Sequence, residues 1–226
     1  MRCVPKRKTL ITLVLFSLAV ITGAASLRGP QEKPGTSPGR FDFWVLALSW
    51  SPTYCIQDGQ DDTAQCGSNR REGFVVHGLW PQYERGYPAN CEYGPERIDY
   101  RFADEMADLI PSPGLVFHQW RKHGRCTGLS PEAYFKATRQ AAEQVSIPRN
   151  LLTAPSEKLS PDVIEAGFLA ANTGLETNGM AVICNNGLFR EVRICLDKGM
   201  NYRACAEVDA DACRAGALTI PEAGRS

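Results

Sequence analysis

Eight cysteines spread over residues 55–213 constrain this 226-residue chain more than any other feature of its sequence. A ninth, Cys3, lies in an N-terminal segment of a different character. An even number of cysteines in an exported chain is typical of a disulfide framework formed in an oxidising compartment. Zinc is the alternative use, but no two cysteines have C-x-x-C spacing. Eight cysteines allow on the order of a hundred pairings, so the pairing stays open at this point.

Residues 1–25 have the layout of a secretory signal peptide. A basic start precedes an uncharged, largely apolar run from Thr9 to Thr22, and small residues follow at 23–26. The run is shorter than the roughly 20 residues of a membrane span. We therefore expect cleavage near Ala25 and a periplasmic or secreted protein without membrane contact, the alternative being an uncleaved anchor. The absence of any N-x-S/T sequence favours a bacterial source.

The formal net charge of zero is an average over unlike parts of the chain. Lys+Arg and Asp+Glu both number 25, and the predicted signal peptide removes four basic residues and no acidic one. The remainder carries 21 basic and 25 acidic residues, a net charge of −4. A protein that grips many phosphates needs a broad basic surface. The balance excludes that class and is compatible with an enzyme that engages one phosphate.

The composition of the rest of the chain predicts one globular domain. With 43% hydrophobic and 22% charged residues, it is neither disordered nor a coiled coil. Residues 26–40 are rich in Pro and Gly and predict a flexible leader, so the single domain is expected over 41–226.

Apolar runs predict strands at both ends of this domain. We expect buried strands over Phe41 to Trp50 and Gly73 to Trp80, the second stopped by Pro81, with a polar loop between them over 54–72. A hairpin is expected over 180–184 and 188–196, joined at Asn185-Asn186-Gly187. The tail that holds Cys205 and Cys213 has little periodic pattern.

Helices are expected between these strands. They cover about 98–110, 115–123, 130–145 and 160–172, and Ser-Pro-acidic sequences open the last two. Strands at both ends with helices between them predict an α+β fold with an antiparallel sheet packed against helices.

The three histidines fall in two short segments, FVVHGLWP and FHQWRKHGRC. At about 100° per residue, a helix over the second segment places His118, Lys122, Gln119 and His123 within one arc of about 140°. Trp120 and Arg121 point elsewhere, so Trp120 can anchor the helix. His77 ends the first segment's apolar strand, where alternation would align it with Val75 and Leu79.

If His77 faces that helix, two groups that titrate near neutrality lie beside cations. One histidine can take a proton from an attacking hydroxyl while the other protonates a leaving oxygen, and Lys122 neutralises phosphoryl charge. RNA supplies the nucleophile as its 2′-hydroxyl. A metal-dependent hydrolase is the competing interpretation. However, HQWRKH lacks the H-E-x-x-H pattern, and a Lys on the same arc would repel a cation.

FVVHGLWPQ and HQWRKHGRC resemble the two active-site segments of the ribonuclease T2 family, and WVLALSWSPTYC resembles its first strand. The resemblance spans about Phe43 to Cys213. It implies a metal-independent endoribonuclease with no cofactor and low base specificity, which acts through a 2′,3′-cyclic phosphate. RNA is the expected substrate, and we expect a monomer with no obligate protein partner.

The resemblance also implies a role for each site residue. His123 matches the general base, His77 the general acid, His118 a phosphate-binding residue, and Lys122 the cation that stabilises the phosphorane. Trp80 matches a base-binding residue, and Tyr83 and Tyr87 are candidates to extend that surface. The implied disulfides are Cys91–Cys126, Cys184–Cys213 and Cys195–Cys205, which leaves Cys55–Cys66 as a local pair.

One position departs from the family pattern, because Gln119 stands where a Glu is usual. A Gln exchanges hydrogen bonds but carries no charge. We interpret Gln119 as tuning a catalytic residue set that is otherwise complete. The alternative is a catalytically weakened RNA-binding or storage-type relative.

Overall fold

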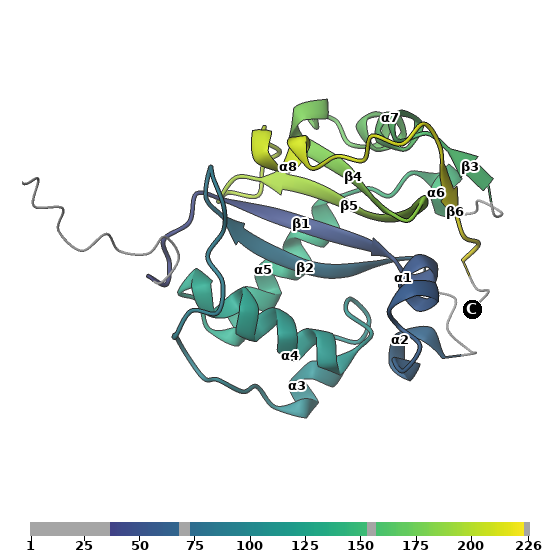
Figure 1. Ribbon diagram of the computed structural model, residues 1–226. Coiled ribbons are helices and arrows are strands. Elements are labelled where there is room, and N and C mark those ends of the chain that lie inside the picture. Colours follow the sequence, from purple (N-terminus) through teal and green to yellow (C-terminus); the bar gives the residue numbers. More distant parts are fainter. Residues whose placement is uncertain (1–36, 68–72, 153–156, 224–226) are drawn as a thin grey trace, which may run out of the picture. The chain divides into compact units, whose positions relative to one another are not determined.

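The computed structural model describes residues 37–67, 73–152 and 157–223 (Figure 1). The expected signal peptide, 1–25, and the leader as far as residue 36 lie outside these ranges. The last leader residues make contact with the domain, since the Gly39 N–H donates to the Cys126 carbonyl at 2.9 Å. Within the described ranges, no helix is long and apolar enough to cross a membrane.

A six-stranded sheet forms the centre of the domain, with strands in the spatial order β2-β1-β5-β6-β3 and β4 paired to β5. The strands are β1 (Phe43–Trp50), β2 (Phe74–Gln82), β3 (Glu157–Leu159), β4 (Met180–Asn185), β5 (Leu188–Leu196) and β6 (Leu218–Ile220). The α+β class is confirmed. The sheet is mixed rather than wholly antiparallel, because β6 pairs parallel to β5 at Leu188 and Thr219. With three residues, β6 is too short to show a pattern in the sequence.

Helices occupy the regions expected between the strands, with additions, but the helix expected over 98–110 covers only Tyr100–Glu105. The α-helices are α1 (Ser51–Gln57), α2 (Thr63–Cys66), α3 (Tyr100–Glu105), α4 (Pro113–Lys122), α5 (Pro131–Gln144), α6 (Arg149–Leu152), α7 (Pro161–Ala171) and α8 (Ala206–Ala210), and the 3₁₀ turns are η1 (Gly124–Thr127) and η2 (Thr177–Gly179). Ser130 and Ser160 cap α5 and α7 through hydrogen bonds from Ala133 N and Val163 N. The prediction of a loop over 54–72 was wrong where α1 and α2 form, and residues 68–72 lie outside the described ranges. Pro52, whose fixed φ suits a first helical turn, opens α1 there.

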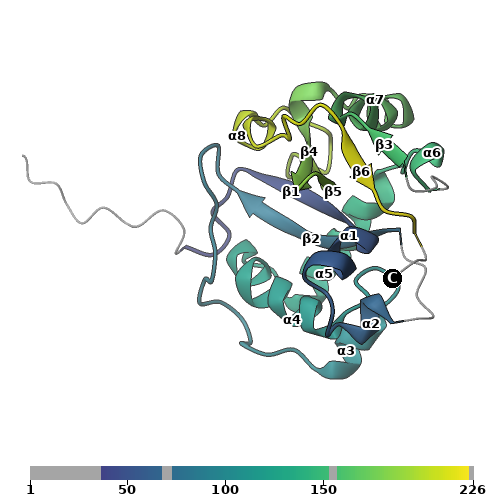
Figure 2. The same cartoon turned by 45° about the vertical axis from the view of Figure 1, so that its right-hand side comes forward.

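Both faces of the sheet are covered, and β1 is buried on both. On one face, Trp44, Leu46 and Leu48 join the main core with residues of α4, α5 and α7. On the other, Phe43 and Val45 join a smaller cluster that includes Val208 of α8. In Figures 1 and 2, α3, α4 and α5 lie together beside the β1–β2 pair, and α8 lies at the end of β4 and β5.

A β-bulge interrupts β2 at His77. Ala47 pairs with Gly78 and Leu48 pairs with Val76, so His77 has no partner across the ladder. Such a bulge reverses the alternation of faces. Leu79 therefore joins Val76 in the main core, contrary to the expected alignment of His77 with Leu79.

The turn at 185–187 and Pro81 were both expected to end strands, and only the first expectation is confirmed. The hairpin turn expected at Asn185-Asn186-Gly187 joins β4 and β5, but Asn185 is the last residue of β4, so the turn itself is Asn186 and Gly187, with φ of 50° and 75°. Pro81 does not stop β2, which runs on to Gln82. This is possible because β2 is an edge strand of the sheet, where a missing N–H costs no ladder bond.

Four disulfides join the described cysteines, the three that the resemblance implied and the remaining local pair. They are Cys55–Cys66, Cys91–Cys126, Cys184–Cys213 and Cys195–Cys205.

Candidate active site

One cleft, with a volume of about 410 Å³, brings both histidine segments together on the face of the sheet that carries the smaller cluster. Its lining residues are Val45, His77, Trp80, Gln82, Tyr87, His118, Gln119, Lys122, His123, Arg193, Glu207, Val208 and Asp211. All five residues expected to be catalytic are among them, and so is Trp80. The walls contributed by β5 and α8 are additions that the motifs did not indicate.

Tyr83 lies outside this cleft. It packs against the main core, whereas Gln82, one residue earlier in the extended chain, lines the cleft. Successive side chains of a strand point to opposite faces, which explains the difference. Tyr87, with 53% of its surface exposed, is the tyrosine at the cleft.

Helix α4 presents the expected arc to the cleft. His118, Gln119 and Lys122 line it, and His123 follows as the C-terminal cap residue. Trp120 is fully buried on the opposite side, where its indole N–H donates to the Pro95 carbonyl at 2.8 Å. The buried indole holds the helix against the core, so its polar arc faces the cleft.

The Gln119 amide contacts Trp80. The indole N–H of Trp80 donates to Gln119 Oε1 at 2.8 Å. Because an indole nitrogen only donates, this bond fixes the orientation of the amide. Gln119 is 1% exposed, and its Nε2 has no hydrogen-bond partner among the described residues. Gly78 makes this arrangement possible, since a Cβ there would collide with Gln119 Oε1 and the Trp80 indole nitrogen.

His123 is buried in the cleft wall, with 4% of its surface exposed. Its ring stacks on Trp80, with centroids 5.3 Å apart and planes 23° apart. Burial, followed by the positive charges of Lys122, His77 and His118, lowers the pKa of His123 to about 2. The Nδ1 atom has no hydrogen-bond partner among the described residues. His123 is therefore uncharged at neutral pH.

His118 stands nearer to solvent on the same arc. Partial burial, and then the charges of Lys122 and Arg121, lower its pKa below the ordinary value. Lys122 makes this end of the cleft basic, while Glu207 and Asp211 place carboxylates at the end formed by α8.

His77 is paired with a carboxylate that the motifs did not reveal. Its Nδ1 lies 2.6 Å from Oε2 of Glu191 in β5, whose side chain is 3% exposed. The other carboxylate oxygen of Glu191 accepts from Nε of Arg193 at 2.9 Å, and the Arg193 guanidinium lies 5.3 Å from the centroid of the Trp80 ring. The available signal was a Glu within the mostly apolar stretch of 188–196, with Arg193 two residues later on the same face.

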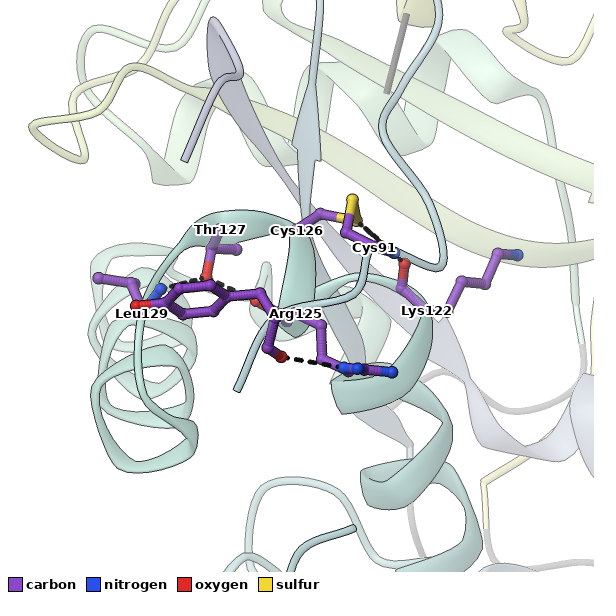
Figure 3. The surroundings of a disulfide bond; sticks show 8 residues. Cys91, Lys122, Arg125, Cys126, Thr127 and Leu129 are labelled. Carbon is purple, nitrogen blue, oxygen red and sulfur yellow. Dashed lines mark hydrogen bonds between the residues drawn. A yellow bond between two sulfur atoms is a disulfide. The ribbon is translucent and has the colours of Figure 1, made fainter. Parts of the chain in front are cut away.

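A disulfide anchors the end of α4 that carries His123. Cys126 lies three residues after His123 and bonds to Cys91 of the preceding loop (Figure 3). Beside it, the Asn90 N–H donates to the Lys122 carbonyl at 2.9 Å, and Nε of Arg125 donates to the Tyr93 carbonyl at 2.9 Å. The loop is thus fastened beside the catalytic arc by a disulfide, a backbone hydrogen bond and the Arg125 side chain.

The described part of the chain holds no cluster of three His, Cys, Asp or Glu side chains arranged for a metal ion.

The chain matches known proteins over most of the domain. Residues 41–205 match the model of the Ribonuclease T2 family. A ribonuclease of Aeromonas hydrophila is 36% identical over 173 residues, which are 75% of this chain and 78% of that protein. A probable ribonuclease of Haemophilus influenzae is 33% identical over 177 residues, 73% of this chain and 61% of that protein.

Solved structures share the fold. An RNase-related protein from Calystegia sepium superposes with a TM-score of 0.66 at 23% identity, covering 80% of this chain and 98% of the other. Ribonuclease NT in complex with 5′-AMP gives 0.57 at 22% identity with the same coverage. A point mutant of ribonuclease MC1 in complex with 5′-UMP gives 0.55 at 20% identity, covering 80% of this chain and 93% of the other.

Proposed function

Because the chain belongs to the ribonuclease T2 family and is a ribonuclease of that type, we propose that it is an exported, metal-independent endoribonuclease. It cleaves RNA by attack of the 2′-hydroxyl on the neighbouring phosphate, which produces a 2′,3′-cyclic phosphate. The observation that carries this proposal is the contrast between two histidines of one cleft. His123 is buried and uncharged, whereas His77 is 32% exposed and bonded to a carboxylate.

The different surroundings of the two histidines suit His123 to the role of general base and His77 to the role of general acid. Uncharged His123 accepts the proton of the 2′-hydroxyl as the 2′-oxygen bonds to phosphorus. The bond from phosphorus to the 5′-oxygen breaks, and the His77 imidazolium gives its Nε2 proton to that oxygen. His123 ends the step protonated and His77 ends it neutral, so protons balance without another group. Each such transfer contributes about 10²–10⁴-fold to the rate.

The remaining residues of the α4 arc bind the phosphate. Lys122 and His118 line the same end of the cleft, where Lys122 neutralises negative charge on the phosphoryl oxygens and the His118 ring contributes a hydrogen-bonding group. The unpaired Nε2 of Gln119 is a donor that faces away from Trp80, and it gains a partner when a phosphoryl oxygen enters. Gln119 thus supports catalysis as a neutral donor.

We assign the base to the end of the cleft formed by Tyr87, Gln82 and α8. Tyr87 is exposed and offers an aromatic face to a base of any identity. Trp80 already contacts His123 and Arg193 through its ring, so we assign it chiefly to positioning. We propose low base specificity because an aromatic face stacks on any base.

Digestion of total RNA in the presence of EDTA tests this function. We expect cleavage to short fragments, and cyclic phosphate as the product from dinucleotides. His77→Ala and His123→Ala should each remove nearly all turnover while the far-ultraviolet circular dichroism spectrum is retained. Near wild-type rates in either variant would overturn the assignment. Loss of cleavage in EDTA would favour metal-dependent hydrolysis, and binding without cleavage would favour a weakened RNA-binding relative.

We also propose export with removal of residues 1–25, ahead of a single catalytic domain over 41–226. Four disulfides among the described cysteines support an oxidising compartment. N-terminal sequencing of the protein recovered from the periplasm or medium tests both parts, with a start near residue 26 expected. A cytoplasmic protein that still begins at Met1 would refute export.

A further inference from the structure

Glu191 is a buried carboxylate behind the wall of the cleft, and the proposed reaction leaves it without a task. It lies in β5, separated from His77 of β2 by the intervening strand β1. Neighbouring strands are about 4.8 Å apart, so a direct contact across β1 needs small side chains there. Ala47 and Ser49 meet that need, because they pair with Arg193 and Glu191 in register.

Three donors surround the Glu191 carboxylate. Oε2 lies 2.6 Å from Nδ1 of His77 and 3.2 Å from the Ser49 hydroxyl, and Oε1 accepts from Arg193 Nε at 2.9 Å. Burial alone would raise the pKa of Glu191, but the hydrogen bond and charge of His77, together with Arg193, hold it at about 2. The group is therefore an ionised carboxylate, which only accepts hydrogen bonds.

We propose that Glu191 is the positioning residue for the general acid, an inference that rests on the proposed function. The carboxylate keeps a proton on Nδ1 of His77, which turns Nε2 toward the substrate as the atom that gains and gives the catalytic proton. It also stabilises the imidazolium form, which a general acid must have before it can act. After transfer, His77 is a neutral imidazole with its Nδ1–H still bonded to Glu191.

The charged groups around His77 show why the Glu191 carboxylate matters for the protonated ring. Besides Glu191, the charged or titratable groups that line the two cavities beside His77 are Arg193 of β5, His118, Lys122 and His123 at the α4 side, Tyr87, Glu207 and Asp211 toward α8, and Tyr54, Asp58 and Arg190 on the other side. Asp58 pairs with Arg190 at 3.1 Å. Lys122 therefore places a positive charge in the same cleft, and Glu191 is the carboxylate within hydrogen-bond distance of the His77 ring.

Gln119 increases the importance of Glu191 in this site. It leaves α4 without a carboxylate in the cleft, since its amide carries no charge. In this chain, the buried carboxylate of the site is Glu191 of β5. It contacts His77, the proposed acid, instead of lying beside His123, the proposed base.

Glu191→Gln separates a role in acid catalysis from a role in folding. The amide keeps the size and an acceptor but loses the charge. For a dinucleotide substrate, we expect kcat at pH 7 to fall about 10- to 100-fold with KM little changed. The alkaline limb of the kcat profile should move to lower pH, because the amide no longer places a negative charge 2.6 Å from the ring of the general acid. Glu191→Asp should restore part of the rate.

A substrate with a 4-nitrophenolate leaving group in place of the 5′-nucleoside supplies the decisive comparison. This leaving group needs little protonation, so His77→Ala and Glu191→Gln should both lose far less rate on it than on the dinucleotide. A merely structural defect would lower both rates equally. Asp108→Asn, which removes the exposed ion pair with Arg139, is the matched carboxylate-to-amide control and should alter neither rate.

The outcomes distinguish the two proposals. An active His77→Ala enzyme overturns the function itself. If His77→Ala is inactive on the dinucleotide but Glu191→Gln keeps the wild-type pH profile, the function stands and the role of Glu191 is refuted. Equal losses on both substrates in Glu191→Gln would also refute it. Thermal unfolding of each variant shows whether the folded fraction explains a lost rate.

Discussion

The indole ring of Trp80 stacks on the imidazole of His123, while its N–H donates to Gln119 Oε1 at 2.8 Å. One side chain of β2 thereby holds in the cleft a side chain of α4, Gln119, and the cap residue that follows the helix, His123. The stacked ring also contributes to the burial that keeps His123 uncharged. The sheet and the helix are coupled at the proposed catalytic base.

Trp80→Phe should preserve an aromatic face for His123 but leave Gln119 Oε1 without its donor. A buried acceptor that loses its partner costs about 1–3 kcal/mol of unfolding free energy. We expect kcat on a dinucleotide to fall on the order of ten-fold with a smaller effect on KM. Trp50→Phe removes a similar indole hydrogen bond, to Pro221, within the main core. That control should lose stability but keep the kcat of the folded enzyme, and equal kcat losses would contradict the role of Trp80.

The acid limb of the kcat/KM profile should lie well below pH 6.5. A general base works in its deprotonated form, and burial with Lys122 nearby lowers the pKa of His123 to about 2, so the base stays available in acid. Lys122→Met removes one cation, which raises that pKa and should move the limb to higher pH as well as lowering the rate. Lys136→Met on the exposed side of α5 is the control. A wild-type limb at or above pH 6.5 would be inconsistent with this environment.

Gln119→Glu should change the pH profile. A carboxylate can still accept from the Trp80 indole, but its charge beside His123 favours the imidazolium and moves the acid limb to higher pH. Because position 119 is 1% exposed, burying that charge should also lower the melting temperature. Gln144→Glu, at the exposed end of α5, is the matched control. An unchanged profile would show that Gln119 does not tune the base.

Replacing both Cys91 and Cys126 by Ala should remove about 4 kcal/mol of stability, because the disulfide closes a loop over a sequence separation of 35 residues. It should also lower kcat, since the bond fastens the end of α4 next to His123. The pair Cys55 and Cys66, with a separation of 11, is the comparison. Its loss should cost about 3 kcal/mol and spare kcat in the folded protein. Urea unfolding and kcat at a temperature where both variants are folded test the difference.

Tyr87→Ala should raise KM for RNA at least several-fold with less effect on kcat, because stacking of a base on an aromatic ring is worth about 1–3 kcal/mol. Tyr100→Ala removes an even more exposed tyrosine that lies outside the cleft. It should leave KM unchanged. An equal response of the two variants would place the base elsewhere.

Much of the fold could be predicted because its signals are local. The Ser130 and Ser160 caps and the Asn186-Gly187 turn depend on residues a few positions apart, and the structure confirms all three. Strand β6 and the short helix α8 could not be predicted. Their few residues carry no pattern, and they take their structure from packing against β4 and β5.

The sequence by itself determined the polar arc at α4, because helical geometry alone brings His118, Gln119, Lys122 and His123 to one side. The segment that carries this arc also identified the family to which the chain belongs. Only the tertiary structure decided which carboxylate accompanies this set. Glu191 meets His77 across 114 residues of sequence, through a bulge in β2 and the small side chains of β1. Strand register and burial depend on distant parts of the chain, so no local pattern could reveal the pair.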